Sequence, residues 1–589
     1  MSFRNLSSFL TELEQQKELR RIRVEVDPEL EITEIATRVV RQEGPALLFE
    51  KVKGSPFPLA INIFGSARRI ELALGRPPQQ IGQELLSLAQ SMNPPRWLGL
   101  WKSRKALRRT FAMHTQVVLW GAPSQQIVQE PALDRLPVLK CWPQDGGRFI
   151  TFGLVMTRHP QTGVRNVGVY RMQVFGPSST GMHWQIQKGG GFHYSEAERR
   201  GQNLPLAVVI GADPCLLLAA VAPLPEGMDE VAFSGFLRGS PARLVKARSI
   251  PMRVPSEAEF ILEGYVHTDE RAMEGPFGDH FGHYSKAAPF PVFHVRSMTH
   301  RKRPIYLAAV VGKPPQEDRY LGNATQEILS PLIRLIHPEI QELWAYYETG
   351  FHNLLVVSVR QRYGKEAVKT GLGLLGEGQL SLTKCLVLVD TNVNVRDSHA
   401  VFRAIQQNFD PSEDVLILPG TPLDTLDFTG DAMATGGKIN LDATRKPNIR
   451  PVRKSPPQQS FHFLKERDSR IIGWKLLDDA LLVVQVGREG RSILESLLYD
   501  AALEGIKIVA MVSPDVDLED RESTLWGIFT RFDCVRDVTF TEMRLDGPVA
   551  RYGGRMGIDA TWKKGYPDPL EMNEEIREKV NVRWDEYGI

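Results

Sequence analysis

Cysteine is scarce in this sequence, and no segment is suited to cross a membrane. The cysteines are spread over 589 residues without paired spacing, at Cys141, Cys215, Cys385 and Cys534. This pattern excludes a CxxC-type zinc site and a disulfide framework, and it fits a reducing cytoplasm. The longest apolar stretch, Leu204 to Pro225, contains Asp213 and several prolines, which would leave backbone groups unsatisfied in lipid. We expect a buried strand pair there.

The first residues also lack the pattern of a signal peptide, which is a basic run followed by an apolar stretch. A cytoplasmic location is therefore expected. One basic segment, Trp97 to Phe111, carries lysines and arginines beside aromatic and leucine side chains, as an interfacial helix does. It predicts either a solvated helix packed by its aromatic face or peripheral contact with a membrane, which would suit a long-tailed lipid substrate.

Neither sign of charge dominates the chain. The 72 basic residues nearly balance the 70 acidic ones, so no field argues for a nucleic-acid partner. With 42% hydrophobic and 24% charged residues, the composition is that of an ordinary globular protein.

The length and the spacing of apolar residues predict an α/β protein of several domains. Helix and strand patterns alternate over residues 1–115, which indicates a small N-terminal α/β domain. Closely spaced β-rich runs predict a β-barrel-like core over residues 116–315. These runs are Gln116–Leu119, Phe152–Thr157, Val167–Phe175, Leu206–Ile210, Ala258–Tyr265 and Pro291–Ser297. Residues 325–460 alternate strands with helices, which predicts a C-terminal α/β domain with a mostly parallel sheet. An extension follows over residues 461–589.

An internal repeat links the extension to the α/β domain before it. Lys384–Val389 aligns without gaps on Lys507–Val512, and the register continues through Asn408–Asp410 on Arg531–Asp533. A second match pairs residues 436–444 with residues 553–561. Residues of about 465–565 are therefore interpreted as a degenerate copy of the preceding α/β unit, joined to it by a Pro- and Lys-rich linker over 445–459. An added half-domain or an oligomer contact is the expected role.

Two carboxylates stand five positions apart in the segment Glu274–His280, which is rich in Gly and Pro and predicts a turn. Two carboxylates that are close in space cannot both ionise freely, so one of them is pushed toward its protonated form. The residues alone leave two interpretations open. The segment is either an acidic surface loop or a pair that divides acid and base work.

Four blocks in one order resemble the UbiD-type decarboxylases. They are Asn166–Gln173, Gly181–Trp184, Asp229–Gly235 and Glu274–His280, and the similarity extends from the N-terminal helix through Asp145-Gly146-Gly147 and Gly211–Pro214 to Lys438 and Leu441–Thr444. The resemblance implies a flavin-reductase-like split barrel in the central domain. It also implies a prenylated flavin mononucleotide that removes, or in some members adds, a carboxylate on aromatic or α,β-unsaturated acids.

The resemblance also implies roles for individual residues. Arg171, Glu274 and Asp279 would be catalytic, with Asp279 as proton donor and Arg171 holding the substrate carboxylate. The cofactor would be lined by Asn166, Val169, Tyr170, Arg171, His183, Trp184, Gln185, Lys188 and Gly189. A divalent metal, expected to be Mn²⁺ with K⁺ as a further candidate ion, would bind Asn166, His183 and Glu230, whose oxygen and nitrogen donors suit it. His183 has a second candidate role as a partner of the cofactor phosphate.

The expected function is non-oxidative decarboxylation of a hydroxybenzoate-type acid, with or without a polyprenyl tail, in quinone biosynthesis. The alternatives are the reverse carboxylation, alone or as a subunit of a carboxylase, and a non-catalytic assembly protein. No side chain in these motifs can act as the electron sink, whereas a modified flavin can. A flavin prenyltransferase is the expected supplier of that cofactor, since nothing in this sequence resembles such an enzyme. A homo-oligomer is expected.

Overall fold

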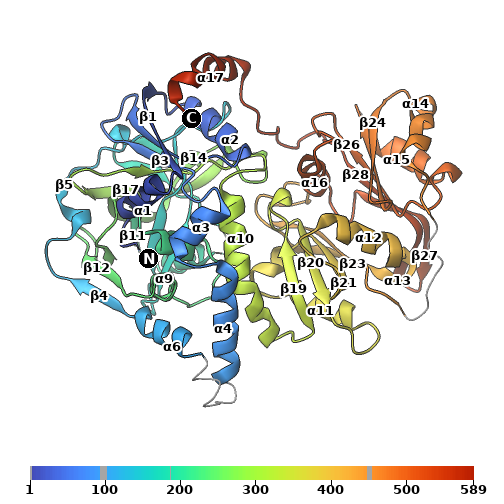
Figure 1. The fold of residues 1–589 in the computed structure, drawn as a ribbon, viewed down its shortest axis with the longest axis horizontal. Coiled ribbons are helices and arrows are strands. Elements are labelled where there is room, and N and C mark those ends of the chain that lie inside the picture. The colour runs from blue at the N-terminus through green and yellow to red at the C-terminus, as the bar shows by residue number, and fades with distance from the viewer. Residues whose placement is uncertain (1–2, 93–102, 186–187, 447–453, 488) are drawn as a thin grey trace. The chain divides into compact units, whose positions relative to one another are not determined.

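The computed structural model describes residues 3–92, 103–185, 188–446, 454–487 and 489–589 (Figure 1). The described chain divides into two compact units. Unit 1 comprises residues 1–329 together with 568–589, and unit 2 comprises residues 330–567. The predicted segments 1–115, 116–315, 325–460 and 461–589 stay a prediction, and the last 22 residues belong with unit 1.

The N-terminal part of unit 1 is a small sheet with helices. Its strands follow the order β1-β2-β3-β18, in which β1 pairs parallel with β2. Helix α1 begins after Asn5, whose side chain accepts a hydrogen bond from the Ser8 N–H, and its buried face carries the apolar residues at helical spacing. The elements are α1 (Leu6–Gln15), β1 (Leu19–Val26), α2 (Glu31–Arg41), β2 (Ala46–Val52), β3 (Leu59–Ile61), α3 (Ala67–Leu74), α4 (Pro78–Met92), α6 (Arg104–Thr110) and β18 (Tyr306–Leu307).

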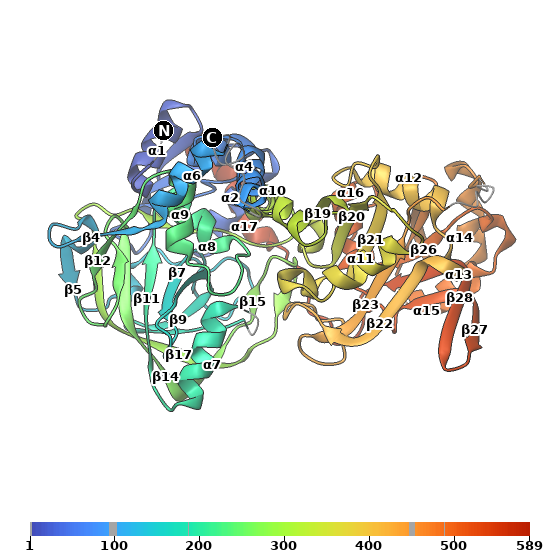
Figure 2. The ribbon, with the colours of Figure 1, turned by 90° about the horizontal axis from the view of Figure 1, so that it is seen from below.

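The central part of unit 1 is a curled, mostly antiparallel sheet of the order β6-β9-β10-β17-β14-β11-β7-β8, with β5 added beside β17. Its longest strands, β14 and β17, run side by side (Figure 2). The strands are β5 (Ile127–Gln129), β6 (Phe149–Ile150), β7 (Leu154–Arg158), β8 (Arg165–Val169), β9 (Met172–Gly176), β10 (Ser179–Gly181), β11 (Leu204–Ile210), β14 (Phe260–Glu274) and β17 (Ala288–His300). The smaller strands of this part are β4 (Thr115–Val118), β12 (Ala242–Lys246), β13 (Arg253–Pro255), β15 (Phe277–Gly278) and β16 (Tyr284–Ser285), and its helices are α7 (Gly189–Arg199), α8 (Pro214–Val221), α9 (Glu230–Arg238) and α10 (Asp318–Leu329).

Three sequence predictions about this part are corrected. The run Val167–Phe175 is not one strand, because β8 ends at Val169 and β9 begins at Met172. Glu274 is the last residue of β14 rather than part of a turn. The apolar stretch after residue 204 is not a strand pair, because α8 follows β11. Gly211 with φ of 69° ends the strand, and Asp213 caps a helix that starts at Pro214.

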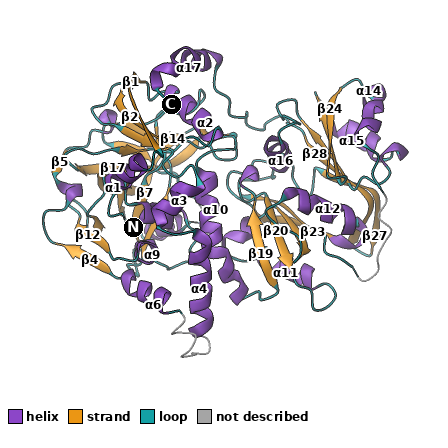
Figure 3. Cartoon of the chain, viewed as in Figure 1, coloured by secondary structure: helices purple, strands orange, loops and turns teal. Residues whose placement is uncertain are grey.

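Unit 2 contains two α/β copies with the same strand order (Figure 3). The first copy, residues 340–446, has the sheet β19-β20-β21-β23-β22, and the second copy, residues 471–564, has β24-β25-β26-β28-β27. The first copy comprises β19 (Ile340–Ala345), β20 (Leu354–Val359), α11 (Glu366–Leu374), β21 (Cys385–Asp390), α12 (Ser398–Asn408), α13 (Pro411–Asp414), β22 (Val415–Pro422) and β23 (Thr435–Asp442). The second comprises β24 (Ile471–Leu477), β25 (Leu481–Val486), α15 (Gly490–Leu498), β26 (Ile508–Val512), α16 (Arg521–Phe529), β27 (Val538–Asp546) and β28 (Val549–Ala560), preceded by α14 (Phe463–Arg467). The fold class is therefore the predicted α/β multi-domain class with a central curled sheet and a duplicated unit.

The C-terminal helix α17 (Glu574–Tyr587) packs against α2 within unit 1. Lys579 and Arg583 of this helix form ion pairs with Glu31 on α2, and the Tyr587 hydroxyl donates a hydrogen bond to the same carboxylate. The last residues of the chain are therefore part of the core of unit 1.

The basic segment Trp97–Phe111 is described only from Ser103 onward, so its tryptophans lie outside the described residues. Residues Arg104–Thr110 form α6, and the Phe111 side chain is 73% exposed rather than packed. No described helix is long and apolar enough to span a bilayer.

Candidate active site

Arg171 joins two carboxylates that are more than a hundred residues away in the sequence. Its Nε donates to Glu274 Oε1 at 3.1 Å, and its terminal nitrogen donates to Asp279 Oδ2. His183 Nδ1 lies 2.9 Å from the same Glu274 oxygen. All of these side chains are largely buried, and Glu274 is only 1% exposed. The structure therefore brings the three predicted catalytic residues into one charged cluster, which also contains His183.

The sheet positions each member of this cluster. Arg171 lies at the break between β8 and β9, and Glu274 ends β14. His183 follows β10, which pairs with β17, the neighbour of β14. Arg171 thus lies in the interruption between β8 and β9, where the predicted single strand is broken.

Residues 145–147 hold the loop that carries Asp279. Asp145 accepts hydrogen bonds from the Cys141 and Trp142 N–H groups on one oxygen and from the Gly278 N–H at 2.8 Å on the other. Gly146 N–H donates to Pro276 O at 2.8 Å, and a Cβ at Gly146 would lie 2.2 Å from Gly275 O. Only glycine fits this close approach.

Sequence reasoning gave Asp145 no role, although it included the residue in the resemblance. It also missed Gln173, whose amide links the same two loops. Gln173 accepts from the Gly275 N–H and donates to Gly146 O, each at 2.8 Å. The signal available in the sequence was the pairing of an Asp-Gly-Gly turn with a Gly-Pro turn, but nothing in the sequence shows that the two turns meet.

The surroundings of Asp279 act on its pKa in opposite directions. Burial raises the pKa of Asp279, but the hydrogen bonds from His280 and the positive charge of Arg171 outweigh it, so the pKa lies well below its usual range. This direction favours the ionised form of Asp279 and gives no support to a partly protonated Asp279. Burial and the Arg171 charge lower the pKa of His183, which favours its neutral form.

A second group of predicted residues surrounds the start of helix α7. The Tyr170 hydroxyl accepts a hydrogen bond from the Gly190 N–H at 3.1 Å, and its ring contacts that of Trp184 at 5.2 Å between centroids. Trp184 also stacks on Tyr194. A Cβ at Gly189 would lie 2.1 Å from Asn166 Oδ1. The glycine run 189–191 begins α7, with Lys188 at its N-cap position.

The predicted metal ligands are only partly brought together. Glu230 Oε2 accepts from the Val167 N–H at 2.9 Å, and the Asn166 amide oxygen, in the orientation that satisfies the amide, accepts from the same N–H and from Gly190. His183 instead faces Glu274. Within the described ranges, no group of three or more His, Cys, Asp or Glu residues is placed to hold a metal ion.

The cofactor-binding prediction can be tested against the unpaired polar atoms. Glu274 Oε2 and Trp184 Nε1 are buried without a hydrogen-bond partner among the described residues. Unpaired buried polar atoms are costly, so a native site normally supplies their partners. The start of α7 offers backbone N–H groups and the positive end of a helix dipole, which favour a phosphate. The donor set therefore fits a phosphate-bearing cofactor. Val169 and Gln185, which are also predicted to line the cofactor, are half-buried. They are the sequence neighbours of Tyr170 and Trp184.

Comparison with known proteins gives matches over most of the chain. Models of the 3-octaprenyl-4-hydroxybenzoate carboxy-lyase N-terminal, Rift-related and C-terminal domains match residues 10–89, 117–314, and 319–443 with 481–560, respectively. The last two ranges span most of the two copies of unit 2. An Archaeoglobus fulgidus protein is 46% identical over 448 residues, covering 76% of this chain and 92% of that protein. A Chlamydia pneumoniae protein, named as one subunit of a 4-hydroxybenzoate decarboxylase, is 37% identical, covering 100% of this chain and 98% of that protein.

Two solved enzyme structures are also similar to this chain. The vanillic acid decarboxylase of Sedimentibacter hydroxybenzoicus, in closed form, matches with a TM-score of 0.69 at 27% identity, covering 79% of this chain and 98% of that chain. The UbiD-class enzyme HmfF of Pelotomaculum thermopropionicum, in complex with FMN, matches with a TM-score of 0.64 at 27% identity, covering 77% and 97%.

Proposed function

The chain belongs to the UbiD family of 3-octaprenyl-4-hydroxybenzoate carboxy-lyases, and from this premise we propose that it removes CO₂ from a hydroxybenzoate-type aromatic acid. The cofactor is prenylated FMN, and the ion is Mn²⁺. Relatives that are named for the decarboxylation of 4-hydroxybenzoate and vanillic acid support this substrate class. A polyprenyl tail on the substrate, as in quinone biosynthesis, is the variant that the family description suggests.

One observation carries the proposal, the buried cluster of Arg171, Glu274 and Asp279. A guanidinium can hold a substrate carboxylate through two parallel hydrogen bonds. The uncoordinated Glu274 Oε2 leaves this residue able to accept one more hydrogen bond from a substrate hydroxyl. Arg171 and Glu274 would thus bind the two polar groups of a hydroxybenzoate, its carboxylate and its hydroxyl.

Asp279 is the proposed proton donor, although its lowered pKa favours the ionised form in the ligand-free cluster. A substrate carboxylate that engages Arg171 shares its positive charge, which removes part of the effect that keeps the pKa of Asp279 low. The carboxyl group can then take up a proton and deliver it to the carbon from which CO₂ leaves. Substrate binding itself therefore prepares the acid.

Asn166, Val169, Tyr170, Arg171, His183, Trp184, Gln185, Lys188 and Gly189 are the residues proposed to hold the cofactor. When bound, the modified flavin supplies the electron sink that the side chains lack. Trp184 Nε1 would donate a hydrogen bond to it, and the first turn of α7 would receive its phosphate.

Glu230 and Asn166 are the proposed ligands of the metal ion, with His183 as the third candidate. Burial raises the pKa of Glu230 to about 7, so a cation beside this carboxylate would relieve the cost of burying its charge. Oxygen donors of this kind suit Mn²⁺. K⁺ is the candidate for a further, weaker site.

The test is co-expression with a flavin prenyltransferase, followed by absorbance spectroscopy and a screen for CO₂ release. The substrates are 4-hydroxybenzoate, vanillate, their polyprenylated forms and α,β-unsaturated acids. CO₂ release from one aromatic acid, dependent on the modified flavin, supports the proposal. Flavin-loaded protein that releases no CO₂ but fixes bicarbonate into a phenol identifies a carboxylase. Protein that binds no flavin identifies the assembly-protein alternative.

The name of the chlamydial relative favours one refinement. Because that protein is named as part of a multi-subunit decarboxylase, the screen should also be run with further subunits supplied. Turnover that appears only then would assign this chain as the catalytic part of a larger enzyme.

A further inference from the structure

The two copies of unit 2 contact each other through equivalent faces. Each sheet has one face in a separate core, formed with α11 in the first copy and with α15 in the second. The other faces of both sheets share one continuous hydrophobic core, together with helices α12 and α16. The same side of each copy is therefore turned toward its duplicate.

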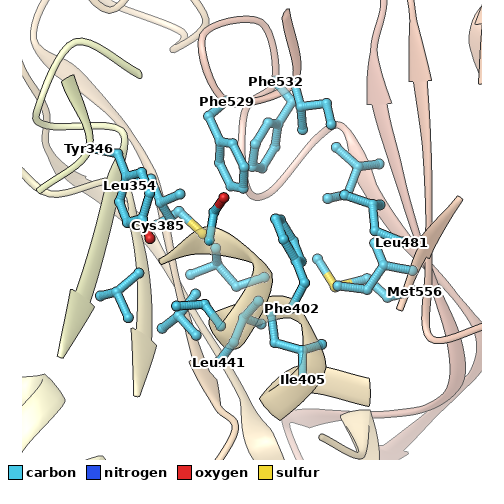
Figure 4. A pocket seen from close by; sticks show the side chains of 18 residues that line it. Tyr346, Leu354, Cys385, Phe402, Ile405, Leu441, Leu481, Phe529, Phe532 and Met556 are labelled. Carbon is cyan, nitrogen blue, oxygen red and sulfur yellow. The ribbon is translucent and has the colours of Figure 1, made fainter. Parts of the chain in front are cut away.

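Equivalent positions of the repeat fill this shared core. The offset between the copies is 123 residues along β21 and α12 and 117 residues along β23. Equivalent buried residues in the core are Ile405 with Ile528, Phe409 with Phe532, and Leu441 with Ile558. Figure 4 shows an apolar cavity in this core, into which Phe402 and Leu441 of the first copy and Leu481 and Met556 of the second point. We call this contact between the two copies the seam. Apolar side chains of both copies line it.

One pair of equivalent lysines makes reciprocal contacts between the two copies. Lys384 Nζ of the first copy lies 5.2 Å from the centre of the Phe532 ring. Its equivalent, Lys507, donates from Nζ to Phe409 O at 3.0 Å. Because Phe409 and Phe532 are also equivalent, each lysine reaches the same position of the opposite copy.

One pair of equivalent residues meets directly. Arg521, the first residue of α16, donates from Nε to the Ser398 hydroxyl at 2.6 Å, and Ser398 is the first residue of α12. In a two-fold arrangement, residues beside the axis contact their own equivalents, as Arg521 and Ser398 do. These relations define an isologous interface, the kind that two identical chains form in a symmetric dimer.

Relatives differ in how much of this chain they cover. Chlamydial relatives align over 99% of this chain, whereas the Archaeoglobus protein and the vanillic acid decarboxylase use 92% and 98% of their own lengths to cover only 76% and 79%. The unmatched part is long enough to hold one copy.

We infer that the second copy is a tethered partner subunit. It takes, on the shared face of the first copy, the place that the same face of a second chain would otherwise take. The apolar face is thereby closed within one chain, and the full-length protein does not associate with itself through it. The inference concerns assembly and is independent of the proposed chemistry.

The test is the mass of a variant that lacks residues 465–565, measured by sedimentation equilibrium. A natural relative that matches only 76% of this chain over 92% of its own length indicates that a shorter chain of this family folds. Its exposed face should bind a second copy of the variant. Adding Ile405→Asp, which buries a charge in that face, should then halve the mass. Gln407→Asp, on the exposed side of α12, is the matched control and should leave the mass unchanged. Equal masses with and without Ile405→Asp would overturn the inference.

A second measurement uses the full chain. A protease recognition sequence is inserted within residues 445–459, and the purified protein is cleaved. A second recognition sequence is inserted after residue 567. Cleavage at both sites leaves no peptide bond between the second copy and the rest of the protein. If the seam is an obligate interface, the cleaved copy co-elutes with the remainder of the protein. Elution of the folded copy by itself would overturn the inference, whatever the deletion variant does.

Discussion

Among the described residues of unit 1, the buried carboxylates Glu31 and Glu274 differ in how completely their oxygens are paired. Glu31 is 1% exposed, and both of its carboxylate oxygens have hydrogen-bond or ion-pair partners. Oε1 receives Arg583 and the Tyr587 hydroxyl, and Oε2 receives Lys579 and the Asp27 N–H. Glu274 is equally buried, yet its Oε2 lacks a partner in the described part of the chain. A saturated cluster joins two helices, whereas an unsaturated one keeps a place for a ligand.

The largest effect is expected at the unsaturated cluster. Asp279→Asn keeps the volume and the hydrogen bond to Arg171 but cannot donate a carboxyl proton. Turnover should fall by about 10²–10⁴, the usual range for a general acid, while flavin occupancy stays constant. Solvent-deuterium incorporation at the vacated carbon should fall in parallel. A folded, flavin-loaded variant with near-normal turnover would assign the proton to another group, and Glu274 would be tested next.

Glu230→Gln separates cofactor binding from the charged cluster. If Glu230 ties the metal to the cofactor, bound manganese and bound flavin should both fall by about tenfold or more, since even indirect partners of a metal act at that scale. Elemental analysis and absorbance measure the two occupancies. Glu226→Gln, at an exposed position shortly before α9, is the control. Unchanged occupancies in Glu230→Gln would exclude this residue as a ligand.

Asp145→Asn weakens the support of the charged cluster without removing a member of it. The amide replaces an oxygen that accepts from backbone N–H groups, so the free energy of unfolding should fall by about 1–3 kcal/mol. Turnover should fall as well, because Gly278 precedes Asp279.

The same variant carries a pH signature. Burial raises the pKa of Asp145 to about 6, above the value of about 3.9 for an unfolded chain. The folded state therefore binds the extra proton, and this stabilisation is complete below about pH 4 and is lost as the pH rises through about 6. Urea unfolding across this range should show a smaller difference between the two proteins at pH 7 than at pH 4. A difference that does not change with pH would contradict the assignment.

The smallest effect on catalysis is expected at the saturated cluster. Glu31→Gln removes the charge that Lys579 and Arg583 face, and both cations are partly exposed, so the free energy of unfolding should fall by only about 1–2 kcal/mol. Turnover per folded molecule should stay within about twofold of the unchanged protein. A loss of turnover comparable to that of Asp279→Asn would remove the distinction between the two clusters.

Much of the fold could be predicted because its signals are local. The predicted runs Leu206–Ile210 and Pro291–Ser297 lie within β11 and β17, respectively. Errors arose where a few residues interrupt a strong pattern. Tyr170 and Arg171 leave the ladder between β8 and β9, and Asp213 with Pro214 starts a helix inside an apolar stretch. Hydrophobic periodicity averages over such positions.

The sequence by itself determined the residue types of the site, the order of the motifs and the existence of a second α/β copy, because these are properties of a linear string. Only the tertiary structure decided that Arg171 bonds to Glu274 across 103 positions, that His183 faces Glu274, and that the surroundings of Asp279 lower its pKa. It also decided that the two copies meet through equivalent faces. Long-range strand pairing sets these distances, and burial then sets the electrostatics of the groups it brings together, so neither can be obtained from sequence spacing.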